Sequence, residues 1–110
     1  MDPTAPPSLN EALGRLWVQF LPQMLERVDA LESAGDALAA GSLTNDQRAA
    51  ANSAAHKLAG VLGTFGLTKG TILARETEIL YSGEPETDPA ASARLLQIAE
   101  QLKTMIVAHK

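Results

Sequence analysis

The chain has 110 residues, no cysteine and a formal net charge of −4 at pH 7. The lack of cysteine excludes a disulfide scaffold and a thiolate zinc site, and the scattered basic residues exclude the usual electrostatic footprint of nucleic-acid binding. No stretch approaches the roughly 18 apolar residues of a membrane span, and no signal-peptide pattern is present. We therefore expect a cytoplasmic domain at residues 8–110, preceded by a flexible proline-rich lead-in at residues 1–7.

The first part of the domain predicts two helices. Ser8, with Glu11 three residues later, has the spacing of a capping box and predicts a short first helix that ends near Phe20. Pro22 fits the first turn of a second helix, where a proline removes no hydrogen bond. Apolar residues then recur at helical spacing until Gly41, which is expected to end the second helix.

Three more helices are predicted further along the chain. A third begins at Thr44, with a glutamine at the capping-box position, and stops near Gly66, a candidate for a left-handed cap. A fourth runs from about Thr68 to Ser82. A loop rich in proline and glycine follows, and Pro89 fits the first turn of the last helix.

These patterns predict an all-α fold, an antiparallel up-down four-helix bundle with a short additional N-terminal helix. The third and fourth helices have almost no linker between them, so they must be antiparallel neighbours. Residues equally far from the turn near Leu67 therefore face each other, which places the carboxylate of Glu78 at about the height of His56.

The third helix carries His56 on the side opposite its apolar residues. At about 100° per residue, His56 points roughly 140–200° away from the apolar stripe. The stripe consists of Ala51, Ala54, Leu58, Val61 and Phe65. One turn from the histidine lie Ser53 and Gly60, with Gly63 close to the same line, and none of them can cover an imidazole ring. We expect a solvent-facing histidine.

Two interpretations of this arrangement are open. A lone histidine on a helix is often an ordinary surface residue, and late glycines often mark a helix end. However, each glycine inside a helix costs about 0.5–1 kcal/mol relative to alanine. Clearance for a partner's backbone beside His56 would offset this cost, which favours an imidazole kept open for another macromolecule.

The segment His56-Lys57-Leu58-Ala59-Gly60, followed by Gly63 and Gly66, resembles the signature of histidine phosphotransfer domains, the helical relay modules of two-component signalling. The resemblance implies that His56 accepts a phosphoryl group from an aspartate of a response-regulator receiver domain, or along a histidine kinase route, and passes it on. It implies a phosphoryl carrier rather than an enzyme, with no cofactor or metal of its own and with Mg²⁺ on the partner receiver domain. We expect a monomer.

The resemblance also suggests roles for residues around the histidine. In the family, an acidic or amide side chain on the following helix often orients the imidazole, and Glu78 is the candidate here. Arg75, one turn earlier, is expected to contact the phosphoryl group or to pair with Glu78. The alternative for both residues is a solvated, salt-bridged surface.

The chain departs from the family at one position. Ala59 stands where the family usually has a lysine, three residues after the histidine. Lys57 has a long stem that can still reach the phosphoryl oxygens, and Lys69 is a second possible substitute.

A docking and phosphate surface is expected around the motif. Small residues at Ser53, Gly60 and Gly63 would let a receiver domain approach. Leu62 and Leu67 are the apolar candidates for this surface, although either could equally belong to the core.

A second function remains open, that of a structural bundle which docks a receiver or another signalling domain without being phosphorylated. A metal-binding bundle lacks the necessary inward Glu-x-x-His pattern. The two ends of the chain would suit an N-terminal module of a longer signalling protein.

Overall fold

The computed structural model describes residues 8–82 and 87–109. Within these residues it contains four α-helices, one 3₁₀ turn and no strand, which confirms the predicted all-α bundle. The helices are α1 (Leu9–Ala39), α2 (Asn45–Thr64), α3 (Thr68–Tyr81) and α4 (Ser92–Ala108), and the 3₁₀ turn is η1 (Pro89–Ala91). The predicted lead-in at residues 1–7 and positions 83–86 of the predicted loop lie outside the described residues.

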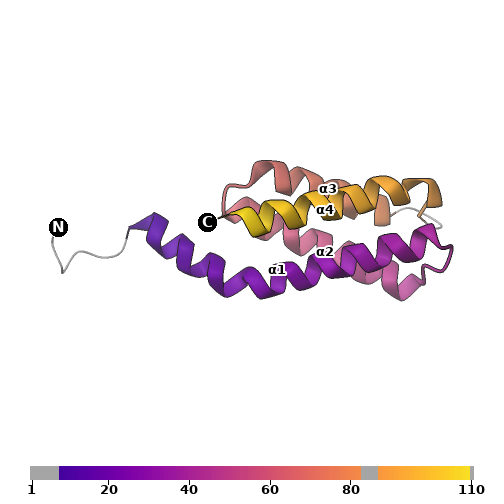
Figure 1. Ribbon diagram of the computed structural model, residues 1–110, viewed down its shortest axis with the longest axis horizontal. Helices are drawn as coiled ribbons and strands as arrows, with labels where there is room; N and C mark the ends of the chain where they lie inside the picture. Colours follow the sequence, from indigo (N-terminus) through magenta and orange to yellow (C-terminus); the bar gives the residue numbers. More distant parts are fainter. Residues whose placement is uncertain (1–7, 83–86, 110) are drawn as a thin grey trace.

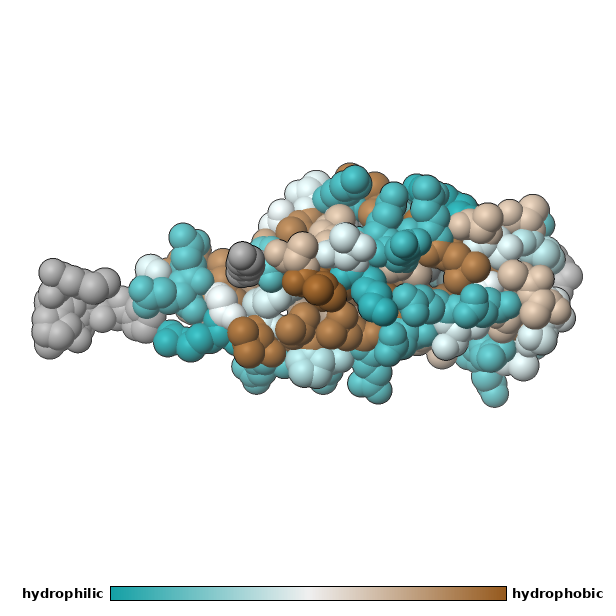
Figure 2. Space-filling model, in the orientation of Figure 1, coloured by the Kyte–Doolittle hydropathy of each residue, from teal (hydrophilic) through white to brown (hydrophobic). Residues whose placement is uncertain are grey.

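The four helices alternate in direction and close an antiparallel bundle (Figure 1). Helices α1 and α3 each pack against both α2 and α4. The N-terminal turns of α1 project beyond the other helices, and the apolar surface in Figure 2 begins where α1 reaches the end of α4 rather than on these turns. Among the described residues, no helix has the length and apolarity that crossing a membrane requires.

The prediction of a separate short N-terminal helix is wrong, because α1 runs without interruption through Pro22. A proline inside a helix removes one hydrogen bond and costs about 3 kcal/mol. The buried residues nevertheless stay in phase across it, since Trp17 and Met24 lie two turns apart on one face and continue to Val28. Burial of these side chains offsets the cost, while the ring of Pro22 is exposed.

The ends of α2 are set by its own sequence. Thr44 and Gln47 form a complete capping box, in which each side chain binds the backbone N–H of the other residue. At the other end, Gly66 has φ of 75°, the left-handed conformation predicted for it. The N–H of Leu67 donates to the carbonyl of Leu62 at 2.9 Å, which closes the helix in a Schellman arrangement. These caps fix where the middle of α2 lies.

The other predicted caps are present with small differences. Ser8 accepts a hydrogen bond from the N–H of Glu11 at 3.1 Å and begins α1. Asp88 accepts from the N–H of Ala90 at 2.9 Å, but the turn it caps is the 3₁₀ turn η1, which leads into α4.

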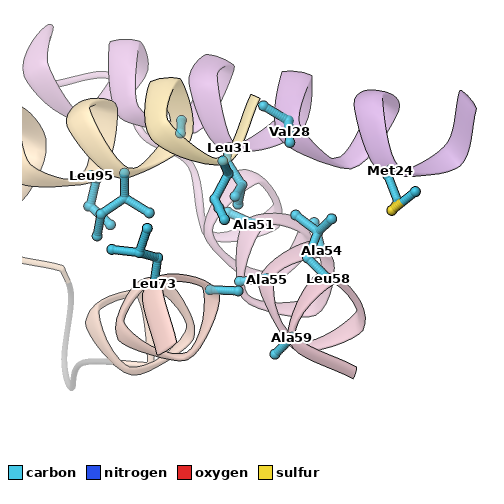
Figure 3. Close-up of a cluster of buried hydrophobic side chains, with 14 of the residues drawn as sticks. Met24, Val28, Leu31, Ala51, Ala54, Ala55, Leu58, Ala59, Leu73 and Leu95 are labelled. Carbon is cyan, nitrogen blue, oxygen red and sulfur yellow. The ribbon is translucent and has the colours of Figure 1, made fainter. Parts of the chain in front are cut away.

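The core lies along the bundle axis and draws on all four helices (Figure 3). Its larger side chains include Met24, Leu31, Leu58, Leu62, Leu73, Leu95, Ile98, Leu102 and Ile106. Between α2 and α3 the contacts are made by small residues, with Ala55 and Ala59 buried on α2 and Gly70 buried on α3. A Cβ at Gly70 would lie 3.0 Å from a methyl of Leu62, so no larger residue fits there without movement. The two backbones therefore approach closely, and side chains on one helix reach the other.

Candidate functional site

His56 lies in the middle of α2, and 68% of its side chain is exposed. Its neighbours one turn away, Ser53 and Gly60, are also exposed. A Cβ at Gly60 would meet no atom within 4 Å, so open space lies beside the ring. The exposure and the clearance expected from the sequence are both present.

Glu78 on α3 reaches across to the histidine. Its Oε2 lies 2.7 Å from Nδ1 of His56, and the glutamate side chain is 23% exposed. A carboxylate accepts hydrogen bonds, so Nδ1 carries the hydrogen, and in a neutral imidazole Nε2 then carries the free lone pair. His56 and Glu78 are equally far from the turn between α2 and α3, and the antiparallel helices bring them together as this spacing predicted.

Asn52 belongs to the same cluster, and the sequence interpretation missed this. It lies one turn before His56, is partly buried, and donates from Nδ2 to the backbone carbonyl of Glu78 at 2.8 Å. The available signal was an asparagine inside a helix, where its propensity is poor, on the side that faces α3. Its partner, the carbonyl of Glu78, depends on how α2 and α3 are aligned, which is known only once the two helices are packed.

An apolar groove between α1 and α2 adjoins the histidine. It is lined by Phe20, Gln23, Arg27, Lys57, Gly60, Val61, Thr64 and Phe65. Its lining includes two cations and no acid, although the chain as a whole is negative. The ring of Phe65 packs edge-on against Trp17, with centroids 5.0 Å apart, which holds one wall of the groove in place.

The apolar residues that line this groove differ from the candidates named from the sequence. Leu62 is fully buried, so of the two alternatives left open for it the core position is the correct one. Val61 and Phe65, predicted as core, are only partly buried and line the groove. The reason is that α2 packs against both α1 and α3, so its buried face is wider than one stripe and is displaced toward α3. Leu67 is also partly buried and packs against the core.

The predicted cations lie at different distances from the histidine. Lys57 lines the groove on the α1 side of His56. Arg75 is exposed one turn before Glu78 and forms no ion pair within residues 8–82 and 87–109, so the predicted pairing with Glu78 is absent there. Lys69 lies beside α4, in a hollow that Glu100 also lines, about 13 Å along the bundle from the height of His56.

Two positions of the motif are used for helix packing. Ala59, which stands in place of the family's lysine, is buried, and its carbonyl accepts a hydrogen bond from the hydroxyl of Thr71 at 3.1 Å. Gly63 is exposed, but a Cβ there would lie 3.4 Å from the same hydroxyl. Both residues permit α3 to lie close to α2.

Ionisable groups elsewhere on α3 have structural roles. Arg94 on α4 donates two hydrogen bonds to the carboxylate of Glu76, at 2.6 and 2.8 Å, and this lowers the pKa of Glu76 from its usual value. Burial raises the pKa of Tyr81 to about 12, and its hydroxyl has no hydrogen-bond partner among the described residues. Within the same residues, no cluster of three or more His, Cys, Asp or Glu could hold a metal ion.

Comparison with known proteins gives a family for this geometry. The family model of the Hpt domain matches residues 15–108. The chain belongs to the Hpt domain family. It is also 34% identical over 96 residues to Protein RcaC of Microchaete diplosiphon, a match that covers 87% of this chain and 14% of that protein. No solved structure shows significant similarity.

Family membership supports a phosphotransfer role in a phosphorelay and a place in two-component signalling. The chain spans about one seventh of the length of the relative named above, so the comparison concerns only the matched part of that protein. The family also implies interaction with response regulators and histidine kinases.

Proposed function

We propose that this Hpt domain carries a phosphoryl group on Nε2 of His56 and exchanges it with the aspartate of a response-regulator receiver domain. The observation that supports the proposal most directly is the hydrogen bond of 2.7 Å between Nδ1 of His56 and Glu78. It leaves Nε2 as the unprotonated nitrogen on a side chain that is largely exposed. An ordinary surface histidine would have no fixed tautomer.

The transfer is a balanced exchange of one bond for another. The lone pair of Nε2 attacks the phosphorus atom, an N–P bond forms, and the P–O bond to the partner's aspartate breaks, so that the carboxylate leaves with its electron pair. The ring gains positive charge, which the carboxylate of Glu78 stabilises through the Nδ1–H bond. Such a transition state needs positioning and charge neutralisation more than covalent chemistry, so this domain acts as a carrier, without kinase or phosphatase activity of its own. In this proposal Mg²⁺ belongs to the partner.

The groove between α1 and α2 suits the partner's surface. The phosphorylation site of a receiver domain is rich in carboxylates, and the groove presents Arg27 and Lys57 above an apolar floor next to His56. Lys57 is thus the cation available to the phosphoryl oxygens in a chain whose usual lysine position is the buried Ala59. Gly60 provides the clearance for the partner's loops.

The proposal is tested by incubating the chain with receiver domains charged by acetyl phosphate. We expect an acid-labile, base-stable phosphate on the wild type and none on His56→Gln. The chain contains one other histidine, His109, whose ring lies against Trp17 in a tilted contact with centroids 4.1 Å apart. His109→Gln is therefore a matched control that should retain phosphorylation. Absence of transfer to the wild type from several receivers, with binding preserved, would support the alternative of an interaction bundle that is not phosphorylated.

A further inference from the structure

Glu78 holds the histidine from the last turn of α3, which ends at Tyr81. The last four carbonyls of a helix have no partner within it, and such ends open most readily. Here the N–H of Ser82, the usual partner of the carbonyl of Glu78, donates instead to the carbonyl of Ile79 at 3.1 Å. The residue that orients His56 thus lies where a helix is weakest.

Asn52 supplies the missing donor. Its Nδ2 donates to the carbonyl oxygen of Glu78 at 2.8 Å. Among the described residues, this amide takes the place of the N–H of Ser82. Asn52 and His56 are one turn apart on the same helix, so α2 holds Glu78 at both its backbone and its carboxylate. The two hydrogen bonds, together with the turn of α2 between Asn52 and His56, hold the carboxylate of Glu78 at the height of Nδ1.

We propose that Asn52 is a positioning residue for the relay histidine. Asn52 caps the last turn of α3 and thereby keeps the carboxylate of Glu78 on Nδ1 of His56. The inference that Asn52 positions Glu78 depends only on these two hydrogen bonds, whereas its consequence for phosphoryl transfer rests on the function proposed above. Asparagine has a lower helix propensity than alanine, so the residue does not favour α2 by itself. Its contribution lies in the contact with α3.

The chain offers a matched control for this contact. Thr71 on α3 donates to the carbonyl of Ala59 on α2 at 3.1 Å, and so it also ties the two helices together. Its hydrogen bond involves neither His56 nor Glu78. Thr71→Val removes a hydrogen bond between the same helices while leaving the last turn of α3 capped.

The experiment measures the tautomer of His56 by ¹⁵N NMR of the imidazole ring, together with the rate of phosphoryl transfer from a charged receiver domain. Asn52→Ala should lower the population with hydrogen on Nδ1 and slow transfer by about 2- to 10-fold, the range that corresponds to one net hydrogen bond. Asn52→Gln, which keeps an amide donor on a longer stem, should restore part of both. Thr71→Val should leave the tautomer of His56 at the wild-type population.

A double-mutant cycle separates positioning from general stability. If Asn52 acts through Glu78, Asn52→Ala should have no further effect on tautomer or rate in a Glu78→Ala background. The proposal is overturned if Asn52→Ala leaves the tautomer unchanged, if Thr71→Val shifts it equally, or if the effect persists without Glu78. A wild type that accepts no phosphoryl group would refute the proposed function, while the tautomer measurement would still decide the role of Asn52.

Discussion

Replacement of Gly60 should affect stability and function in opposite directions. The residue lies inside α2, has an ordinary helical φ, and has no atom within 4 Å of the position of a Cβ. Gly60→Ala therefore gains the helix propensity of alanine without a clash, about 0.5–1 kcal/mol, which raises Tm by about 3–6 °C in a domain of this size. Gly60→Leu is also expected to fold, but its side chain fills the space beside His56. We expect it to reduce transfer from a receiver domain by about 10-fold or more, equivalent to at least 1.4 kcal/mol of partner binding.

Thermal unfolding and transfer kinetics are measured on the same samples. Gly14 is the matched control, because it also lies in a helix, is exposed and has no atom within 4 Å of a Cβ, but it is on the part of α1 that precedes the groove. Gly14→Leu should leave transfer at the wild-type rate. The reasoning is wrong if Gly60→Ala lowers Tm, since the space described for its Cβ would then be filled. It is equally wrong if Gly60→Leu transfers as fast as Gly14→Leu.

Three further predictions concern stability and its dependence on pH. Tyr81→Phe removes a buried hydroxyl that has no partner among the described residues and should stabilise the domain by about 1 kcal/mol in urea unfolding. Because burial raises the pKa of Tyr81 to about 12, the wild type should lose stability as pH rises from about 10 to 12. Tyr81→Phe should not show this loss. The lowered pKa of Glu76 stabilises the fold above pH 4.5 and this contribution is lost as pH falls through the folded-state value, so Glu76→Gln should flatten the acid side of the stability curve, and an unchanged slope would contradict the pairing with Arg94. Trp17→Ala empties a buried site against Phe65 and should cost about 3–5 kcal/mol, whereas a loss below 1 kcal/mol would mean that the aromatic contact is not maintained in solution.

Local residue patterns were sufficient to predict the elements whose causes lie nearby in the chain. The capping box of Thr44 and Gln47 and the left-handed Gly66 bracket α2, so the histidine's place within that helix follows from nearby residues. The short turn after α2 makes α3 antiparallel to it. Counting from this turn was sufficient to pair Glu78 with His56, because both helices rise by the same distance per residue.

Features that depend on packing against several neighbouring helices could not be predicted from local patterns. Pro22 suggests a helix boundary by local rules, yet burial of Trp17 and Met24 on one face keeps α1 continuous. Val61 and Phe65 line a groove and are only partly buried because α2 is covered on two sides, which one apolar stripe does not reveal. Nearby residues determine where a helix ends and which of its faces is apolar. Which face another helix covers, and which carbonyl Asn52 binds, depends on how the helices pack together.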